Sequence, residues 1–453
     1  MMTARARVCL VAVCCVLWTV SATAEETGPE AQLSMASGPA PLPGCEYRPV
    51  DLATHGGRPF RDAPAFTSTD GMLDVDLDVH YAVHVIAGCE VRHRSYNGAL
   101  VGPTLRVRPG DRIRLRLRNL LPPNPDRPSS DHNVPHDFNT TNLHTHGLHV
   151  SPSGKSDNVL LKIEPGEAFE YDIRVPEDHP PGTFWYHAHV HGSTAIQLSS
   201  GMAGALIVEG GLDSVPEIAR AAEKIFLFQH LSYDDQGQIE DFDELFAPGS
   251  WDRLKRHPTI NGQIAPVIRM RPGEVQRWRF IHGGIRESLL IRLKGHVLNE
   301  IAVDGLALGR ISRWQQPIEL QPGYRSDVLV KASALPPGRT RQEFLLVDAE
   351  SAPDISLLAI LEKETVLARV VIEGPPVDGP LPDATALARF LPHKPIADAA
   401  LTGRQKVTFS VFPAAEGGGG FLFTVDGRPF SHNHVRRLKL GGVEEWTLRT
   451  ALT

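Results

Sequence analysis

The sequence GTFWYHAHVHGSTAIQLSSGMAGALI, residues 182–207, carries His187 and His189 two positions apart, behind a run of aromatic residues. Side chains two positions apart on a β-strand leave on the same side, so both imidazoles are expected on one face. A pair with the same spacing, His144 and His146, stands earlier in NLHTHGLHV. Imidazole suits copper, zinc, iron or nickel. We therefore predict that two facing strands present four imidazoles to metal; ordinary surface histidines are the alternative.

Length and composition indicate several β-rich domains. The chain has 453 residues, too many for one ordinary core, which favours two to four domains. Gly (40 residues) and Pro (37 residues) make up about 17% of the chain, against an ordinary share of about 12%, so many turns and few long helices are expected. The net charge of −7, with both signs mixed, gives no support for a nucleic-acid partner.

The first 24 residues have the pattern of a secretory signal peptide. Arg5 and Arg7 precede an apolar run at 8–20, and the small residues at 22–24 fit a cleavage site. The run is too short to cross a membrane comfortably, so cleavage after Ala24 is predicted, with no stable membrane span afterwards. An uncleaved anchor is the alternative. The mature protein is expected in the periplasm or outside the cell.

Cysteine usage fits an oxidising compartment. Cys9, Cys14 and Cys15 would leave with the signal peptide, so the mature chain would keep Cys45 and Cys89. These two either form a disulfide that ties the N-terminal arm to the first domain or remain separate thiols.

A strand–Pro-Gly–strand phrase recurs along the chain. PTLRVRPGDRIRLRL (103–117) is similar to PVIRMRPGEVQRWRF (266–280), and VRRLKLGGVEEWTLR (435–449) is a degenerate third copy. A second phrase occurs as IEPGEAFEYDIRV (163–175) and as LQPGYRSDVLVKA (320–332). Self-similarity at a near-constant period predicts tandem copies of one domain, and alternating strands with frequent turns predict an all-β sandwich for each copy.

The repeat and the composition together predict the domain boundaries. In order they are a signal peptide at 1–24, a flexible arm at 25–69, a first domain at 70–212, a second at 213–375, a linker at 376–400 and the start of a third domain at 401–453. The second copy has no His-x-His pair at the corresponding positions. The middle domain is therefore predicted to be structural.

The histidine motifs resemble those of a known family. LHTHG followed by FWYHAHVHGSTAIQLSSGMAGALIV is similar to the first two copper motifs of the multicopper oxidases, which include laccases, bilirubin oxidases and bacterial periplasmic cuprous oxidases. The resemblance is sharp over 139–209. It implies tandem cupredoxin-like Greek-key β-sandwiches, two complete and a third incomplete. It also implies copper as cofactor, and reduction of dioxygen to water with electrons from phenols, amines or a metal ion.

The resemblance also implies roles for single residues. His144 matches a ligand of the type 2 copper, and His146, His187 and His189 match ligands of the type 3 copper pair. Asp157, in SGKSDNV, falls where family members often place a carboxylate that assists proton delivery. An ordinary turn residue is the alternative interpretation of Asp157.

The sequence departs from the family in its C-terminal part. The third and fourth copper motifs, which carry the other cluster ligands and the mononuclear type 1 site, do not occur in it. A type 1 site needs a cysteine thiolate, and neither Cys45 nor Cys89 has suitable neighbours. We therefore expect a C-terminally truncated, laccase-like oxidase with half a copper cluster, incomplete for turnover by itself. A non-catalytic copper-binding or copper-tolerance protein is the alternative, and four imidazoles alone leave zinc or nickel open.

Three other features have ordinary interpretations. His80 and His84 share a strand face without an evident partner, while His432 and His434 precede the third turn instead of following it. The basic run at 112–118 alternates with apolar residues, as a solvated strand face does. No further metal or anion site is predicted at these positions.

Overall fold

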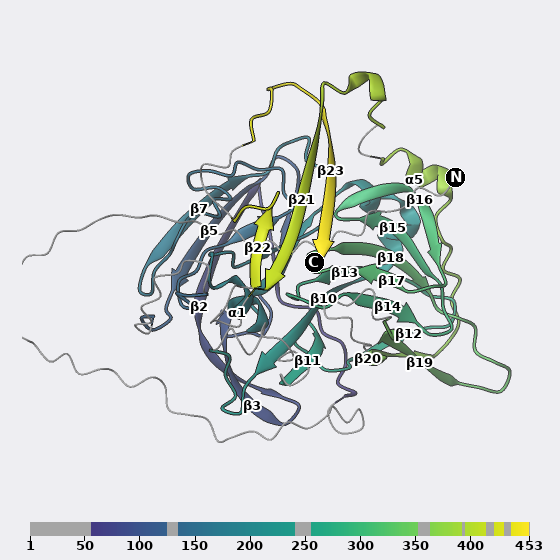
Figure 1. Ribbon diagram of the computed structural model, residues 1–453. Helices are drawn as coiled ribbons and strands as arrows, with labels where there is room; N and C mark the ends of the chain where they lie inside the picture. The colour runs from purple at the N-terminus through teal and green to yellow at the C-terminus, as the bar shows by residue number, and fades with distance from the viewer. Residues whose placement is uncertain are drawn as a thin grey trace, which may run out of the picture.

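The computed structural model describes residues 56–124, 135–240, 255–351, 363–391, 395–413, 421–429 and 436–452. These residues form mainly β-strands joined by turns and a few short helices, which confirms the all-β prediction (Figure 1). The predicted signal peptide, Cys45 and the pair His432 and His434 lie outside the described residues. Within the described part of the chain, no helix has the length and apolarity needed to cross a membrane.

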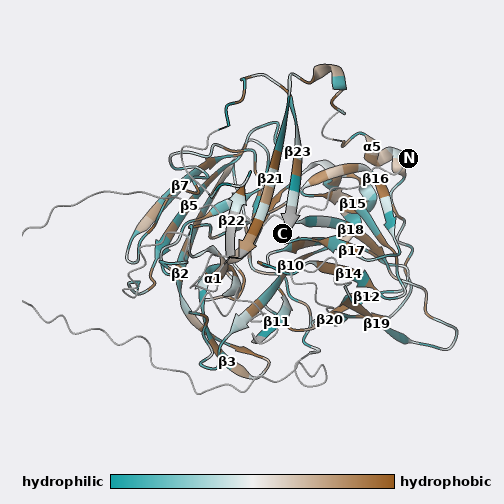
Figure 2. Ribbon diagram, viewed as in Figure 1, coloured by the Kyte–Doolittle hydropathy of each residue, from teal (hydrophilic) through white to brown (hydrophobic). Residues whose placement is uncertain are grey.

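The first sandwich consists of two sheets. One has the strand order β3-β2-β5-β7, with Met72–Ile86 (β2), Cys89–Tyr96 (β3), Arg112–Asn119 (β5) and Ala168–Arg174 (β7). The other has the order β1-β4-β9-β8-β6, with Ala65–Thr67 (β1), Thr104–Val107 (β4), His144–His146 (β6), Gly182–His187 (β8) and Ala203–Val208 (β9). Every second residue of β5, and of β2 as far as Val79, is buried in the shared core, and apolar and polar residues mix along these strands in Figure 2.

The second sandwich repeats this arrangement with longer sheets. One has the order β11-β10-β13-β18-β15-β16, with Ala222–Tyr233 (β10), Lys255–Ile260 (β11), Val275–His282 (β13), Leu298–Val303 (β15), Leu306–Trp314 (β16) and Arg325–Lys331 (β18). The other has the order β12-β20-β19-β14-β17, with Val267–Met270 (β12), Leu289–Leu293 (β14), Ile318–Leu320 (β17), Arg341–Asp348 (β19) and Thr365–Glu373 (β20). Phe226, Trp278 and Phe280 lie at the centre of its core.

A third, three-stranded sheet and short helices complete the described chain. The sheet has the order β22-β21-β23, with Gly403–Pro413 (β21), Phe421–Val425 (β22) and Glu444–Leu452 (β23). The helices are α1 (Thr194–Ser199), α2 (Pro216–Arg220) and α5 (Ala384–Ala388), with 3-10 turns η1 (Gly211–Ser214) and η3 (Asp398–Ala400). Leu387 of α5 is buried, so part of the predicted linker packs on the second sandwich.

The repeated phrases adopt the same strand pairing in each copy. The strand after the first turn, β5 or β13, pairs antiparallel with the strand of the second phrase, β7 or β18. It also pairs parallel with β2 or β10, and β23 pairs parallel with β21 in the third copy. The turn glycines Gly110, Gly273 and Gly441 have φ values of 90°, 77° and 76°, a region that favours glycine. The sequence repeat is therefore a repeat of topology.

The end of the predicted flexible arm differs from its prediction. Within 56–69, β1 pairs with β4, and Pro59 forms a bridge to Val267. The ring of Phe60 lies 4.9 Å from that of Phe226 in the second core. A three-residue strand is too short to show alternation, so pattern reasoning did not find β1. The domain boundaries themselves stay predictions.

Cys89 stands at the start of β3, where it packs beside Leu231 and Tyr233 of β10. It is buried and disulfide-bonded, which agrees with the prediction of an oxidising compartment. Because Cys45 lies outside the described residues, the pairing of Cys45 with Cys89 stays a prediction.

The basic run at 112–118 lies along β5 on the solvent side of the first sandwich. The register with β2 places Arg114 opposite Asp74. It also places Arg118 opposite Asp78, and Arg118 Nη2 donates to Asp78 Oδ2 at 2.8 Å. Opposite charges across neighbouring strands stabilise a sheet face, so an ion-pair ladder accounts for the run.

A buried polar network joins the two sandwiches. Arg279 of β13 donates from Nη1 to Thr183 Oγ1 of β8 at 2.9 Å and to Asp327 Oδ2 of β18 at 3.0 Å. Its Nε donates to Glu223 Oε2 of β10 at 2.6 Å. Arg277 donates to the same oxygen of Asp327 at 2.7 Å. Since Thr183 belongs to the first sandwich and the other residues to the second, the network fixes one sandwich against the other.

This network predicts a loss of stability in acid. Burial alone would raise the pKa of Glu223, but the guanidinium groups of Arg279 and Arg106 outweigh it and lower the pKa from 4.5 to about 2. A carboxylate with a depressed pKa contributes stability above its unfolded pKa and loses it as pH falls toward the folded value. We expect Glu223→Gln to cost on the order of 3 kcal/mol at pH 7, from 1.36 kcal/mol per pKa unit. Urea unfolding of both proteins should show this difference shrinking from pH 4.5 toward pH 2, and a pH-independent difference would contradict the prediction.

Candidate metal centre

The histidine pairs lie on adjacent strands at one edge of the first sandwich. The antiparallel register of β6 with β8 places His144 opposite His187 and His146 opposite Trp185. Alternation turns these four side chains to one face of the sheet and sends the residues between them to the other. The two strands therefore pair directly, and three predicted ligands share one face.

Three of the four histidines form a compact donor group. The nearest ring nitrogens of His144, His146 and His187 all lie within 4.8 Å of one another. His189 follows the end of β8, with its ring centre 5.0 Å from that of His144 and 5.4 Å from that of His187. The structure thus brings all four predicted histidines together.

Trp185 forms one wall of the centre. Its ring stacks on His187 at 4.2 Å between ring centres and on His146 at 5.0 Å, with interplanar angles of 25° and 28°. This buried indole shields both rings from water. Strand alternation turns the next residue, Tyr186, into the first core, where its hydroxyl donates to the carbonyl of Pro103 at 2.7 Å.

Burial favours the neutral form of three imidazoles of the centre, those of His146, His187 and His189. Burial lowers the pKa of His146 to about 3, with smaller effects from Arg325 and His144. Burial is also the main cause that lowers the pKa of His187 and of His189. Neutral imidazole is the form that binds a metal, and a gathered set of such nitrogens suits copper among the soft and borderline metals.

Asp157 contacts the centre directly. Its Oδ1 lies 2.9 Å from Nδ1 of His144 and accepts the backbone N–H of Thr145 at 3.0 Å. An ionised carboxylate only accepts hydrogen bonds, so the contact places the imidazole proton on Nδ1 and leaves Nε2 with its lone pair. A carboxylate behind a metal-binding histidine is the usual outer-shell arrangement. The contact thus joins Asp157 to one of the predicted ligands.

Sequence reasoning missed Asn142, which organises this region. Its Oδ1 accepts the backbone N–H of His189 at 2.7 Å, and its Nδ2 donates to the carbonyls of Val159 and Leu161 at 3.0 and 2.9 Å. One fully buried amide thus connects the segment after β8 to the loop that carries Asp157. The available signal in the sequence was the position of Asn142, a polar residue two positions before the predicted ligand His144.

Two neighbouring histidines stand apart from the donor group. The backbone N–H of His149 donates to Nε2 of His179 at 3.0 Å, and their ring centres are 5.0 Å apart. Nδ1 of His179 lies 2.9 Å from the carbonyl oxygen of Pro180, which fixes its tautomer. Both nitrogens of His179 therefore serve the loop structure.

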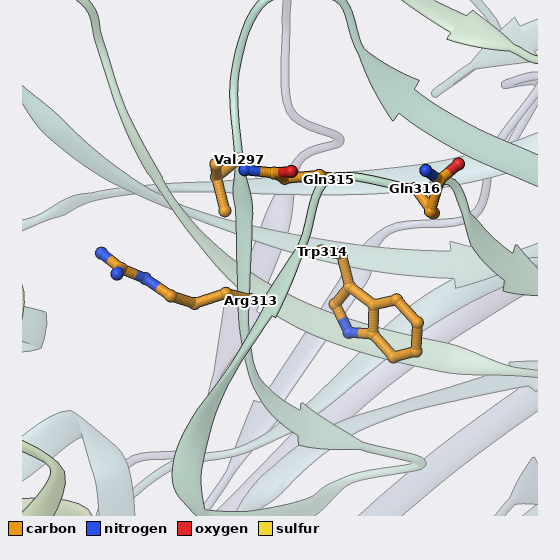
Figure 3. Close-up of a pocket in the computed structure, with 5 residues that line it drawn as sticks. All are labelled: Val297, Arg313, Trp314, Gln315 and Gln316. Carbon is orange, nitrogen blue, oxygen red and sulfur yellow. The ribbon is translucent and has the colours of Figure 1, made fainter.

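A separate cavity of about 470 Å³ lies on the second sandwich (Figure 3). Its lining residues are Val297, Arg313, Trp314, Gln315 and Gln316. The indole Nε1 of Trp314 donates to Glu300 Oε2 at 2.8 Å. Because its lining contains no histidine or cysteine, this cavity offers no soft metal ligand.

Comparisons with known proteins show which sequences this chain resembles. Residues 133–212 and 232–348 each match a sequence model described as multicopper oxidase. The chain is 28% identical over 268 residues to an iron transport multicopper oxidase of Saccharomyces cerevisiae, covering 57% of this chain and 39% of the yeast protein. It is 27% identical over 285 residues to a multicopper oxidase of Staphylococcus aureus, covering 59% of this chain and 54% of that protein.

A solved structure agrees with the fold. A multicopper oxidase from Campylobacter jejuni, described as a metallo-oxidase, superposes with a TM-score of 0.68 and 20% identity over 90% of this chain and 81% of that chain. At this identity the likeness establishes the fold and nothing finer.

Two joined β-sandwiches, with a group of imidazoles at the edge of the first, are an architecture of the cupredoxin-like class. The sequence matches identify a family within this class. The chain belongs to the multicopper oxidase family, whose members are copper-dependent oxidoreductases. The predicted family is thereby confirmed, and the chain spans about half the length, or less, of the curated relatives described above.

Proposed function

We propose that this chain supplies the N-terminal half of the copper cluster of a multicopper oxidase. The enzyme would couple oxidation of a phenol, an amine or a metal ion to the reduction of dioxygen to water. The observation that carries the proposal is the group of imidazoles from two paired strands, with nitrogens within 4.8 Å of one another. Copper, when bound, supplies the one-electron redox chemistry that amino-acid side chains lack.

Each residue of the centre has a proposed part. His144 would hold the type 2 copper, while His146, His187 and His189 would hold the type 3 pair. Nδ1 of His187 lies 2.9 Å from the carbonyl oxygen of Ala188, so its proton points away from the donor group and Nε2 is left for metal. Trp185 excludes water by its stacking on two of these rings.

Asp157 has two proposed tasks. It holds the proton of His144 on Nδ1 through the 2.9 Å contact, which orients the ring. It also lies close enough to the donor group to pass protons during the reduction of dioxygen. The first task follows from geometry alone, and the second rests on the family resemblance.

Copper binding without turnover is a second candidate. Cys89 is the sole cysteine among the described residues, and it is disulfide-bonded, so it offers no thiolate for a type 1 copper. We propose that turnover needs copper ligands beyond the four histidines. The complete oxidase and a copper-binding protein then differ in a measurable way, since only the first consumes dioxygen.

Equilibrium titration of the full chain with Cu²⁺ against a competing chelator tests the proposal. We expect copper bound through nitrogen, visible as nitrogen coupling in the electron paramagnetic resonance spectrum, without an intense blue band or dioxygen uptake with a phenol. Binding no tighter than that of a variant lacking all four histidines would refute the copper site. A blue band with turnover would refute the need for further ligands.

Export is proposed as well, from the signal pattern at 1–24. Mass spectrometry of the protein recovered from its native compartment is expected to show an N-terminus at Glu25. Recovery of the intact Met1 terminus in the cytoplasm would contradict this proposal.

The outer-shell task of Asp157 gives a further prediction. Asp157→Ala removes the acceptor from His144 Nδ1, and loss of such partners typically costs about 10–100-fold in metal affinity. Asp157→Asn is the matched control, because its amide oxygen still accepts from both His144 and Thr145. The chelator titration should rank the alanine variant well below the asparagine variant. Equal affinities for all three proteins would show that the contact does not orient the ligand.

A further inference from the structure

A turn of the second sandwich lies against the metal centre. Gly323, in the repeated Pro-Gly phrase before β18, has a φ of 88°. A methyl group on its Cα would lie 3.1 Å from Cε1 and 3.5 Å from Nε2 of His146, and 3.9 Å from the Trp185 ring. The turn therefore closes on the ring of one proposed copper ligand, and a methyl group there would fit only if that ring moved by a few tenths of an ångström.

Arg325 fixes this turn to the first sandwich. Its guanidinium donates from Nη1 to the carbonyl of Gly323 at 2.8 Å and from Nε to the carbonyl of Thr183 in β8 at 3.3 Å. The side chain is buried and also donates from Nη2 to the carbonyl of Asp304 at 3.1 Å. A methyl group at Gly147, the residue after His146, would lie 2.7 Å from the same Nη2.

The first copy of the repeat shows that the fold does not require these contacts. Its corresponding glycine, Gly166, has nearly the same φ, 87°, yet nothing lies within 4 Å of a methyl group placed there. The position that matches Arg325 is occupied by the exposed Ala168. Burying a guanidinium destabilises a protein unless the group is well paired. The second copy nevertheless buries Arg325, although the same turn forms in the first copy without an arginine.

We propose that Gly323 and Arg325 are positioning residues that set the orientation of the His146 ring for copper. The inference rests on the proposed copper site. It gives the middle domain, which lacks histidine pairs of its own, a part in the metal centre: Gly323 permits the close approach, and Arg325 holds the turn in place. The expected effect is on the copper site and not only on folding.

The repeat supplies a matched pair of variants. Gly323→Ala and Gly166→Ala place the same methyl group at the same positive φ, one against His146 and one in open space. Both full-length variants, checked for folding by circular dichroism, would be titrated with Cu²⁺ alone and their resonance spectra recorded. We expect Gly323→Ala to bind copper about tenfold or more weakly than Gly166→Ala, with altered nitrogen coupling, as for other outer-shell changes.

Arg325→Lys keeps the charge but loses the planar fork that reaches three carbonyls at once. We expect it to shift the copper spectrum in the same direction as Gly323→Ala, and it carries the test if Gly323→Ala does not fold. Identical affinities and spectra for Gly323→Ala and Gly166→Ala, or an unchanged spectrum for Arg325→Lys, would overturn the inference while leaving the copper site intact. Failure of the unaltered chain to bind copper would overturn both.

Discussion

His187→Ala is expected to remove tight copper binding, lowering the affinity for Cu²⁺ by more than about 100-fold, the upper end of the losses seen for outer-shell residues alone. His187 is the most buried of the four histidines, and its Nε2 lies 3.4 Å from Nδ1 of His146. Its ring also stacks on Trp185, so the change opens the donor group to water as well as removing a ligand. Chelator competition and the resonance spectrum would measure the loss.

His149→Ala is the matched control for this experiment. It also removes an imidazole close to β6, but the contact His149 makes with the His179 ring nitrogen comes from its backbone N–H, which the variant keeps. We expect copper binding within about twofold of the unaltered chain, because a residue outside the coordination and outer shells lacks the direct effect on affinity. If His149→Ala and His187→Ala lost affinity equally, the donor group assigned here would be wrong.

The donor group was largely accessible to sequence reasoning because it depends on local rules. Strand alternation places His144 and His146 on one face, whatever the rest of the fold. The same rule predicted a shared face for His187 and His189, although β8 ends at His187 and His189 reaches the group from the segment that follows. The contact of Asp157 with His144 joins residues of one loop and one strand, and the family resemblance pointed to it.

The supports of the site were not accessible in the same way. Asn142 acts through two backbone carbonyls and one N–H that only the folded loop brings together. Gly323 reaches His146 because the two sandwiches pack against each other, a long-range arrangement that no spacing in the sequence encodes. Pattern reasoning identifies donors, whereas the residues that hold donors in place depend on tertiary packing.

The fold, too, was predicted where local sequence signals exist and was missed where they do not. The repeated phrases predicted tandem copies of one domain, because each phrase contains its own turn signal, and the pairing of β5 with β7 and of β13 with β18 is alike in the two copies. The short strand β1 carries no such signal. In the third copy the predicted strand after the turn forms as β23, while the described residues 436–443 before it form no strand. The alternation of basic and apolar residues before this turn does not form a strand, because no strand among the described residues pairs with residues 436–443.

Asp327→Asn is expected to destabilise the protein by about 3–5 kcal/mol, the usual cost of removing one partner from a buried ion pair. Asp327 receives hydrogen bonds from Arg277 and Arg279, and its Oδ1 accepts from Thr183 Oγ1 at 2.5 Å. An amide in its place leaves two buried guanidinium groups with less compensating charge. Urea unfolding at pH 7 would measure the change in the free energy of unfolding.

Asp74→Asn is the control for Asp327→Asn, because it makes the same chemical change in an exposed pair. Its contact with Arg114 is 3.6 Å long, and both side chains are more than half exposed to solvent, where water screens the charges. Little change in stability is expected there. The Asp327 network also spans both sandwiches, so its variant should expose the segment between them, near η1, to proteolysis, and Asp74→Asn should not. If the two variants were equally stable and equally resistant to protease, the network would be dispensable and some other contact would hold the second sandwich, with Gly323, against the metal centre.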